Sequence, residues 1–96
     1  MAEIVWTDRA QQDLREIVEY IARDSKAYAQ SFGLRLRSSV DRLAAFPESG
    51  RAIPEDPDSG LREVIVQPYR LLYKIAPNRV VVLTVVHGMR LLEPPT

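Results

Sequence analysis

The first half of the chain carries apolar residues at helical spacing. They recur three or four positions apart, first at Ala10, Leu14, Ile17, Val18 and Ile21. A second run follows at Tyr28, Phe32, Leu36, Val40 and Leu43. Thr7 and Ser25 suit helix N-caps because their hydroxyls can accept a hydrogen bond from the first turn. The pattern therefore predicts a helix over residues 8–23 and a second one that ends before Pro47, joined as a hairpin.

The second half of the chain is typical of strands. After a short β-prone start at residues 3–6, strand signals return at residues 61–66, 69–75 and 79–87. Pro77 and Asn78 predict a tight turn between the last two strands. Residues 47–60 hold three prolines and two glycines, so they predict an irregular surface loop, whose acidic residues we expect to be solvated.

The turn at Pro77 and Asn78 decides which side chains share a face of the sheet. Pairing Ala76 with Arg79 gives one uniformly apolar set, which we assign to the helices: Leu71, Tyr73, Ile75, Val80 and Val82. The opposite set is Arg70, Leu72, Lys74, Val81, Leu83, Val85 and His87. One helical hairpin covers one face, so the second set is expected to form a docking surface, unless a bend in the sheet or the C-terminal tail hides it.

The composition excludes several classes of functional site. Ninety-six residues predict one domain, 1–96, and thirteen cations against thirteen anions exclude a uniformly basic surface. Residues 61–96 nevertheless carry five cations and two anions, so the sheet half is basic. No cysteine and a single histidine exclude a thiolate site or a histidine pair, and we expect neither metal nor cofactor. No membrane span or targeting signal is apparent, which favours the cytoplasm.

One group of side chains could carry chemistry. Arg62, Arg70, His87 and Arg90 could stabilise charge and move protons at a scissile phosphate, as metal-free RNA cleavage by the 2′-hydroxyl requires. The alternative is that these arginines pair with carboxylates, either those of a protein partner or Glu63 and Glu93. The sequence contains no phosphate-binding glycine loop and no G-x-S-x-G motif.

Taken in order and spacing, several segments resemble the ParE/RelE toxin superfamily of type II toxin-antitoxin systems. They are closest to ParE-like toxins, the plasmid stabilisation proteins, and they read VWTDRAQQDLREIVEYIARDS, FPESGR, SGLREVIV, PYRLLYKI and VVVLTVVHGMR. The resemblance covers nearly the whole chain. It implies an α+β fold of the RelE/ParE-like order β-α-α-β-β-β, with a helical hairpin packed on a small antiparallel sheet.

The same resemblance implies a toxin that inhibits DNA gyrase by binding, without chemistry of its own, and that a ParD-like antitoxin neutralises. The alternative is a RelE-like ribosome-dependent mRNA endoribonuclease, in which Arg62, Arg70 and Arg90 match basic catalytic positions. Val64 stands where that branch has a second lysine, and the chain lacks the terminal tyrosine of that branch. A third reading is an inactive toxin that only sequesters the antitoxin.

For the gyrase-directed reading we assign two sets of contact residues. Those expected to approach the antitoxin are Arg70, Leu72, Lys74, Leu83 and His87. Those expected to approach the target are Arg62, Met89, Arg90, Leu91 and Leu92. We expect no membrane contact and no specific nucleic-acid binding by the toxin alone. Oligomeric state stays open between a homodimer and a toxin-antitoxin hetero-oligomer.

Overall fold

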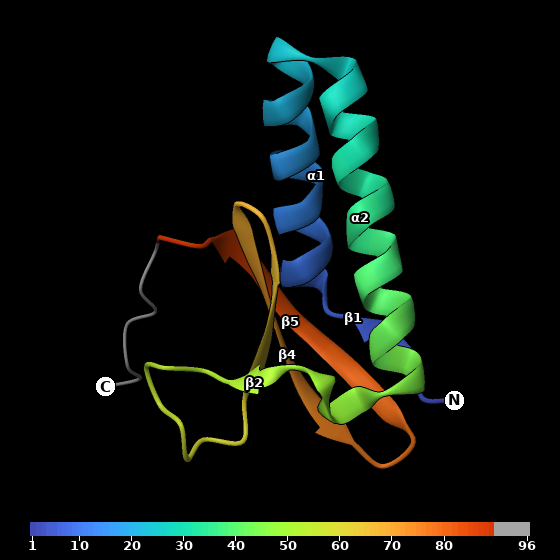
Figure 1. Cartoon of the computed structure of the whole chain (residues 1–96), viewed down its shortest axis with the longest axis vertical. Helices are drawn as coiled ribbons and strands as arrows, with labels where there is room; N and C mark the ends of the chain where they lie inside the picture. The colour runs from blue at the N-terminus through green and yellow to red at the C-terminus, as the bar shows by residue number, and fades with distance from the viewer. Residues whose placement is uncertain (90–96) are drawn as a thin grey trace.

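Two helices lie side by side on one face of a five-stranded sheet in the computed structural model, which describes residues 1–89 (Figure 1). The elements are β1 (Glu3–Trp6), α1 (Asp8–Asp24), α2 (Lys26–Ala45), the 3₁₀ helix η1 (Pro47–Ser49), β2 (Arg51–Ala52), β3 (Arg62–Val66), β4 (Tyr69–Ala76) and β5 (Arg79–His87). The strand order is β1-β5-β4-β3-β2. The predicted RelE/ParE-like architecture is confirmed, with two differences. β1 runs parallel to β5, so the sheet is mixed, and the short β2, in a segment expected to be an irregular loop, adds a fifth strand.

Both predicted helix caps are present. The Thr7 hydroxyl accepts the Ala10 N–H at 3.1 Å, and the Ser25 hydroxyl accepts the Tyr28 N–H at 3.0 Å. Thr7 also donates to the carbonyl of Val82 at 2.9 Å, which ties the start of α1 to β5. Within residues 1–89, neither helix is long and apolar enough to cross a membrane.

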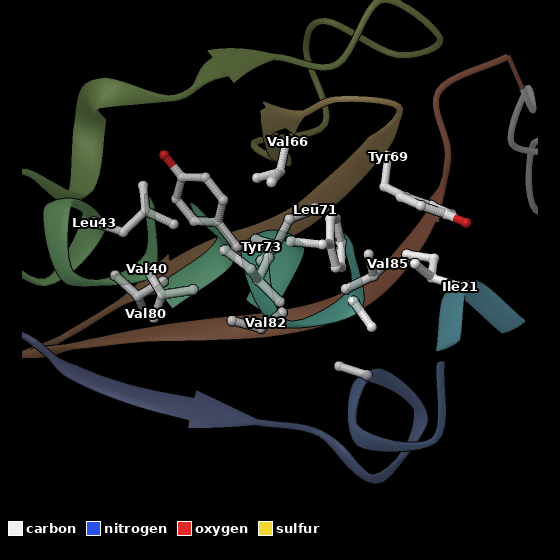
Figure 2. Close-up of a cluster of buried hydrophobic side chains, with 14 residues drawn as sticks. Ile21, Val40, Leu43, Val66, Tyr69, Leu71, Tyr73, Val80, Val82 and Val85 are labelled. Carbon is white, nitrogen blue, oxygen red and sulfur yellow. The ribbon is translucent and has the colours of Figure 1, made fainter. Parts of the chain in front are cut away.

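The main core lies between the helical hairpin and the sheet (Figure 2). Phe32 and Leu43 of α2 pack there against the strands, with at most 1% of either residue exposed. The residues assigned to the helix side of the sheet are buried as predicted, apart from Ile75, which is 42% exposed. Each fully buried large apolar side chain contributes about 1.5–3 kcal/mol relative to an exposed one, so this face supplies much of the stability.

A β-bulge in β5 changes the predicted register. Ala76 pairs with Arg79 as expected, and the pairing holds as far as Tyr73 and Val82; beyond the bulge, Leu72 pairs with Thr84. The extra residue shifts the alternation of β5 by one position. Val85 therefore packs in the core beneath the helices and His87 pairs with Tyr69. The prediction that Val85 and His87 share a face with Arg70 is wrong for this reason.

The second face of the sheet is covered by the loop between β2 and β3. Ile53 from this loop packs with Leu72 and Val86 in a second small core, and Leu61 packs against it. Leu72 is only 1% exposed and Arg70 only 4%. The expectation of an open apolar docking face is therefore wrong at its centre, because the chain folds its own loop across it. Lys74 and part of Leu83 remain accessible.

Candidate functional site

Arg70 lies at the centre of a buried ion-pair cluster on the loop-covered face. Its Nη1 and Nη2 donate to Glu55 Oε2 and Oε1 at 2.7 and 2.8 Å, and Nη2 also donates to Glu63 Oε1 at 2.9 Å. Arg51 Nη2 reaches the other Glu63 oxygen at 3.2 Å. We call these four residues the Arg70 cluster. They join the loop, β3 and β4 through charge-assisted hydrogen bonds.

Arg70, Glu55 and Glu63 are largely buried, so the Arg70 cluster has a structural role. The Arg70 side chain is 5% exposed and that of Glu63 is fully buried. The hydrogen bond to Glu55 is the main reason that the pKa of Arg70 is raised, and Glu63 acts in the same direction against desolvation. The guanidinium is thus held by two carboxylates. For Glu63, this confirms the alternative prediction that these arginines pair with carboxylates. The Arg70 guanidinium is not presented to a phosphate ligand.

Arg62 and the FPESGR turn form a second hydrogen-bonded group beside α2. Arg62 Nη1 donates to the carbonyl of Gly50 at 2.7 Å. The buried Tyr73 hydroxyl donates to the carbonyl of Pro47 at 2.7 Å and accepts the Gly50 N–H at 2.9 Å. Figure 2 shows this hydroxyl pointing at the chain that follows α2. Burial is the main cause that raises the pKa of Tyr73.

His87 stands at the other end of β4 and β5. Its ring meets Tyr69 edge to face, with ring centres 5.7 Å apart, and its Nδ1 accepts the Met89 N–H at 3.1 Å. Because Arg62 pairs with Tyr73 and His87 with Tyr69, the two are separated by four residues of β4. That separation corresponds to about 13 Å along an extended strand.

The predicted catalytic group does not come together in the described part of the chain. Arg62 binds the turn beside α2, Arg70 is enclosed on the opposite face, and His87 lies at the far strand end. Arg90, Leu91 and Leu92, like Glu93, lie outside the described residues. No cluster of metal-ligating side chains occurs among residues 1–89. Among the described residues, Arg62, Arg70 and His87 therefore do not face one common substrate site.

Sequence reasoning missed the role of Glu55. The acidic loop was expected to be solvated, yet Glu55 holds Arg70 through two hydrogen bonds. The signal was available in β4, where Arg70 stands between Tyr69 and Leu71 in an otherwise apolar run. A buried arginine requires a carboxylate partner, so an acidic loop of the same small domain was the natural candidate.

Comparisons with known proteins agree with this architecture. The family of the ParE toxin of the type II toxin-antitoxin system, parDE, matches residues 4–92. Toxin RelE2 of Caulobacter vibrioides is 41% identical over 92 residues, covering 95% of this chain and 100% of the relative. Putative toxin Y4kP of Sinorhizobium fredii is 37% identical, covering 88% of this chain and 86% of the relative.

A solved structure shares the fold. It is described as the chromosomal ParDE TA system from P. aeruginosa, with a TM-score of 0.72 at 20% identity, covering 91% of this chain and 96% of that one. The family match spans both helices and all of the sheet except the first residue of β1. The chain described here therefore belongs to the ParE toxin family of type II toxin-antitoxin systems.

Proposed function

We propose that this toxin acts by binding DNA gyrase, without bond chemistry of its own, and that a ParD-like antitoxin neutralises it in the cytoplasm. The observation that carries the proposal is the dispersal of Arg62, Arg70 and His87 over separate parts of the sheet. Cleavage of a phosphodiester requires cationic and proton-transferring groups around one phosphate. A binding mechanism needs only an exposed surface.

Accessible residues from both predicted contact sets remain on the sheet, although they do not form two compact patches. Lys74, Leu83 and His87 keep accessible surface and remain our candidates for antitoxin contact. Arg70 and Leu72 lie beneath the loop, so they would support such a contact from below. Met89 is 84% exposed beyond the end of β5, and with Arg62 it remains a candidate for target contact.

Ribosome-dependent mRNA cleavage is the second candidate function. What favours it is the 41% identity to a relative named Toxin RelE2. It would require Arg70 to leave both carboxylates, which the hydrogen bonds to Glu55 and Glu63 oppose. An inactive, antitoxin-sequestering toxin is distinguished from both candidates by the absence of growth arrest.

A gyrase supercoiling assay with the purified, folded toxin tests the proposal. We expect inhibition at near-stoichiometric amounts, accumulation of cleaved DNA with gyrase, and reversal by the antitoxin. In a translation reaction the same preparation should leave the mRNA intact by primer extension. Normal supercoiling at saturating folded toxin would overturn the proposal, and new transcript ends within codons would establish the nuclease instead.

A pair of surface variants separates binding from misfolding. Met89→Glu places a charge at the candidate target contact and should weaken gyrase inhibition about tenfold, the effect of losing about 1.4 kcal/mol of binding free energy. Phe46→Glu makes a comparable change at another exposed apolar residue, 65% exposed at the end of α2, and should inhibit like the wild type. Equal inhibition by both variants would show that Met89 does not contact gyrase.

A further inference from the structure

The apolar face of the sheet continues past the end of α2. Ile75 pairs with Val80 of the main core and belongs to the helix-covered face, yet it is 42% exposed. Figure 1 shows the hairpin of β4 and β5 extending beyond the end of α2. Phe46, which ends that helix, is 65% exposed. Both residues line one shallow hollow, so the helical hairpin leaves a piece of the apolar face uncovered there.

This hollow is a contiguous patch with a fixed backbone. Single exposed apolar side chains are common on protein surfaces, whereas a group of them in one place favours contact with another molecule. The Phe46 N–H donates to the Arg42 carbonyl at 2.8 Å, and the Phe46 carbonyl accepts the Ser49 N–H at 3.0 Å. These bonds hold Phe46 in place. We call the lining residues the Phe46 patch; they are Arg42, Ala45, Phe46, Pro47, Glu48, Ser49 and Ile75.

The Phe46 patch carries one cation and one anion. Arg42 and Glu48 flank Phe46 in the sequence, and both are exposed. Within residues 1–89, neither of them forms an ion pair, although both line the same hollow. A partner surface of a single charge sign would therefore attract one of these groups and repel the other. A second copy of the same patch, related by a two-fold axis, offers an anion to the cation and a cation to the anion.

We propose that the Phe46 patch is the interface of a homodimer, in which two copies of this toxin meet about a two-fold axis. Phe46 and Ile75 of each copy are covered by the other copy, and each Arg42 faces the Glu48 of the second copy. The patch is small, so the interface lies at the low end of the size range for specific contacts and the dimer forms reversibly in the micromolar range.

This homodimer goes beyond the proposed function and does not depend on the identity of the target. Ile75 pairs with Val80 near the start of β5, whereas Met89, the candidate gyrase contact, follows the other end of that strand. The dimer therefore leaves Met89 accessible. Phe46→Glu should then lose self-association while it keeps the inhibition of gyrase expected above, so the two proposals fail separately.

Sedimentation equilibrium of the purified full chain tests the interface. We expect the average mass of the wild type to rise with concentration from that of a monomer to that of a dimer. Phe46→Glu should raise the dissociation constant at least about tenfold, because it buries an unpaired charge against apolar groups. Leu34→Glu is the matched control, since Leu34 is a 68% exposed apolar residue of α2 outside the patch, and it should dimerise like the wild type.

A charge swap tests the two-fold arrangement. Arg42→Glu and Glu48→Arg should each weaken the homodimer about fivefold, because each brings like charges together twice. An equimolar mixture of the two variants should form a heterodimer with wild-type affinity, and so should the double variant with itself. Arg37→Glu, at an exposed arginine of α2 outside the patch, should leave the dissociation constant unchanged.

Three results would overturn the homodimer. One is a wild-type mass that stays monomeric at every concentration up to the millimolar range. Another is a dimer that neither Phe46→Glu nor the charge swap affects, which would place the contact elsewhere. The third is a monomeric wild type whose binding to the antitoxin is lost in Phe46→Glu, which would assign the patch to that partner. Circular dichroism of each variant establishes that the fold is retained.

Discussion

The two faces of the sheet are both buried, but by different means. The helix-covered face is sealed by apolar side chains from two helices, and its centre is occupied by Phe32, Leu71 and Tyr73. The loop-covered face has a small apolar core, in which Ile53 packs with Leu72 and Val86, next to the Arg70 cluster. A short loop has few apolar residues to offer. Ion pairs and hydrogen bonds therefore help to hold the loop against one face, whereas apolar contacts hold the helices against the other.

Because of this difference, we expect the replacement of one charged residue on the loop-covered face to lower the stability of the fold strongly. A buried ion pair adds little net stability when complete, because desolvation offsets attraction, but removing one partner leaves an uncompensated charge. On the helix-covered face, the loss of stability on truncating a side chain increases with the volume of the cavity that remains.

The largest effect is expected for Arg70→Ala. It removes the buried partner of Glu55 and leaves the buried Glu63 carboxylate with only the largely exposed Arg51, so the free energy of unfolding should fall by about 3–5 kcal/mol, measured by urea denaturation. In the double variant Arg70→Met, Glu63→Leu, the most deeply buried charges are removed together, and most of the loss should be recovered. A double variant as unstable as the single one would contradict a charge-based explanation.

Leu71→Ala and Leu72→Ala compare the two faces at equal burial. Both leucines belong to β4, each is 1% exposed, and they point to opposite faces. Truncation in a core costs about 2–5 kcal/mol, and the cost rises with the cavity that remains. Leu71 lies under rigid helices and should approach the upper value, whereas the loop over Leu72 can collapse inward. Equal losses in matched urea curves would mean that the loop is as rigid as the hairpin.

Gly50→Ala probes the turn that joins α2 to the sheet. A Cβ at this position would lie 2.7 Å from the Glu63 carbonyl oxygen and would collide with the Tyr73 hydroxyl. Such overpacking costs about 1–3 kcal/mol, which should appear as a lower thermal midpoint. Gly33→Ala is the control, because a Cβ there meets no atom within 4 Å and α2 should gain helix propensity.

The smallest effect is a pH dependence at Tyr73. Burial raises its pKa in the folded chain above the ordinary value of 10.0, so the folded state keeps a proton that the unfolded state loses. This contribution is fully present below pH 10 and is lost as the pH rises toward the folded pKa. Tyr73→Phe should be about 1–2 kcal/mol less stable at pH 8 because the Gly50 N–H loses its acceptor. Its stability should then fall less steeply above pH 10.

Urea midpoints at pH 8, 10 and 11 measure that slope. Tyr20→Phe, at a tyrosine that is 62% exposed, is the matched control and should follow the wild type. Identical slopes for Tyr73→Phe and the wild type would show that Tyr73 does not carry the alkaline effect.

Local features were largely predictable from the sequence. Helical spacing, the caps at Thr7 and Ser25, and the turn at Pro77 and Asn78 depend on neighbours within about four residues, and all are confirmed. The candidate site was less predictable. The bulge in β5 moved Val85 and His87 to new neighbours, and a one-residue shift of register leaves no clear mark in a strand that is apolar on both faces.

The sequence by itself determined that this chain makes two amphipathic helices and a strongly apolar sheet, because periodicity and capping are local properties. Only the tertiary structure decided what covers the second face and which arginines are already engaged. Those outcomes depend on contacts between residues distant in the chain, such as Glu55 with Arg70, whose pairing requires the loop to cross the sheet. The same long-range packing left Ile75 uncovered beside Phe46, past the end of α2.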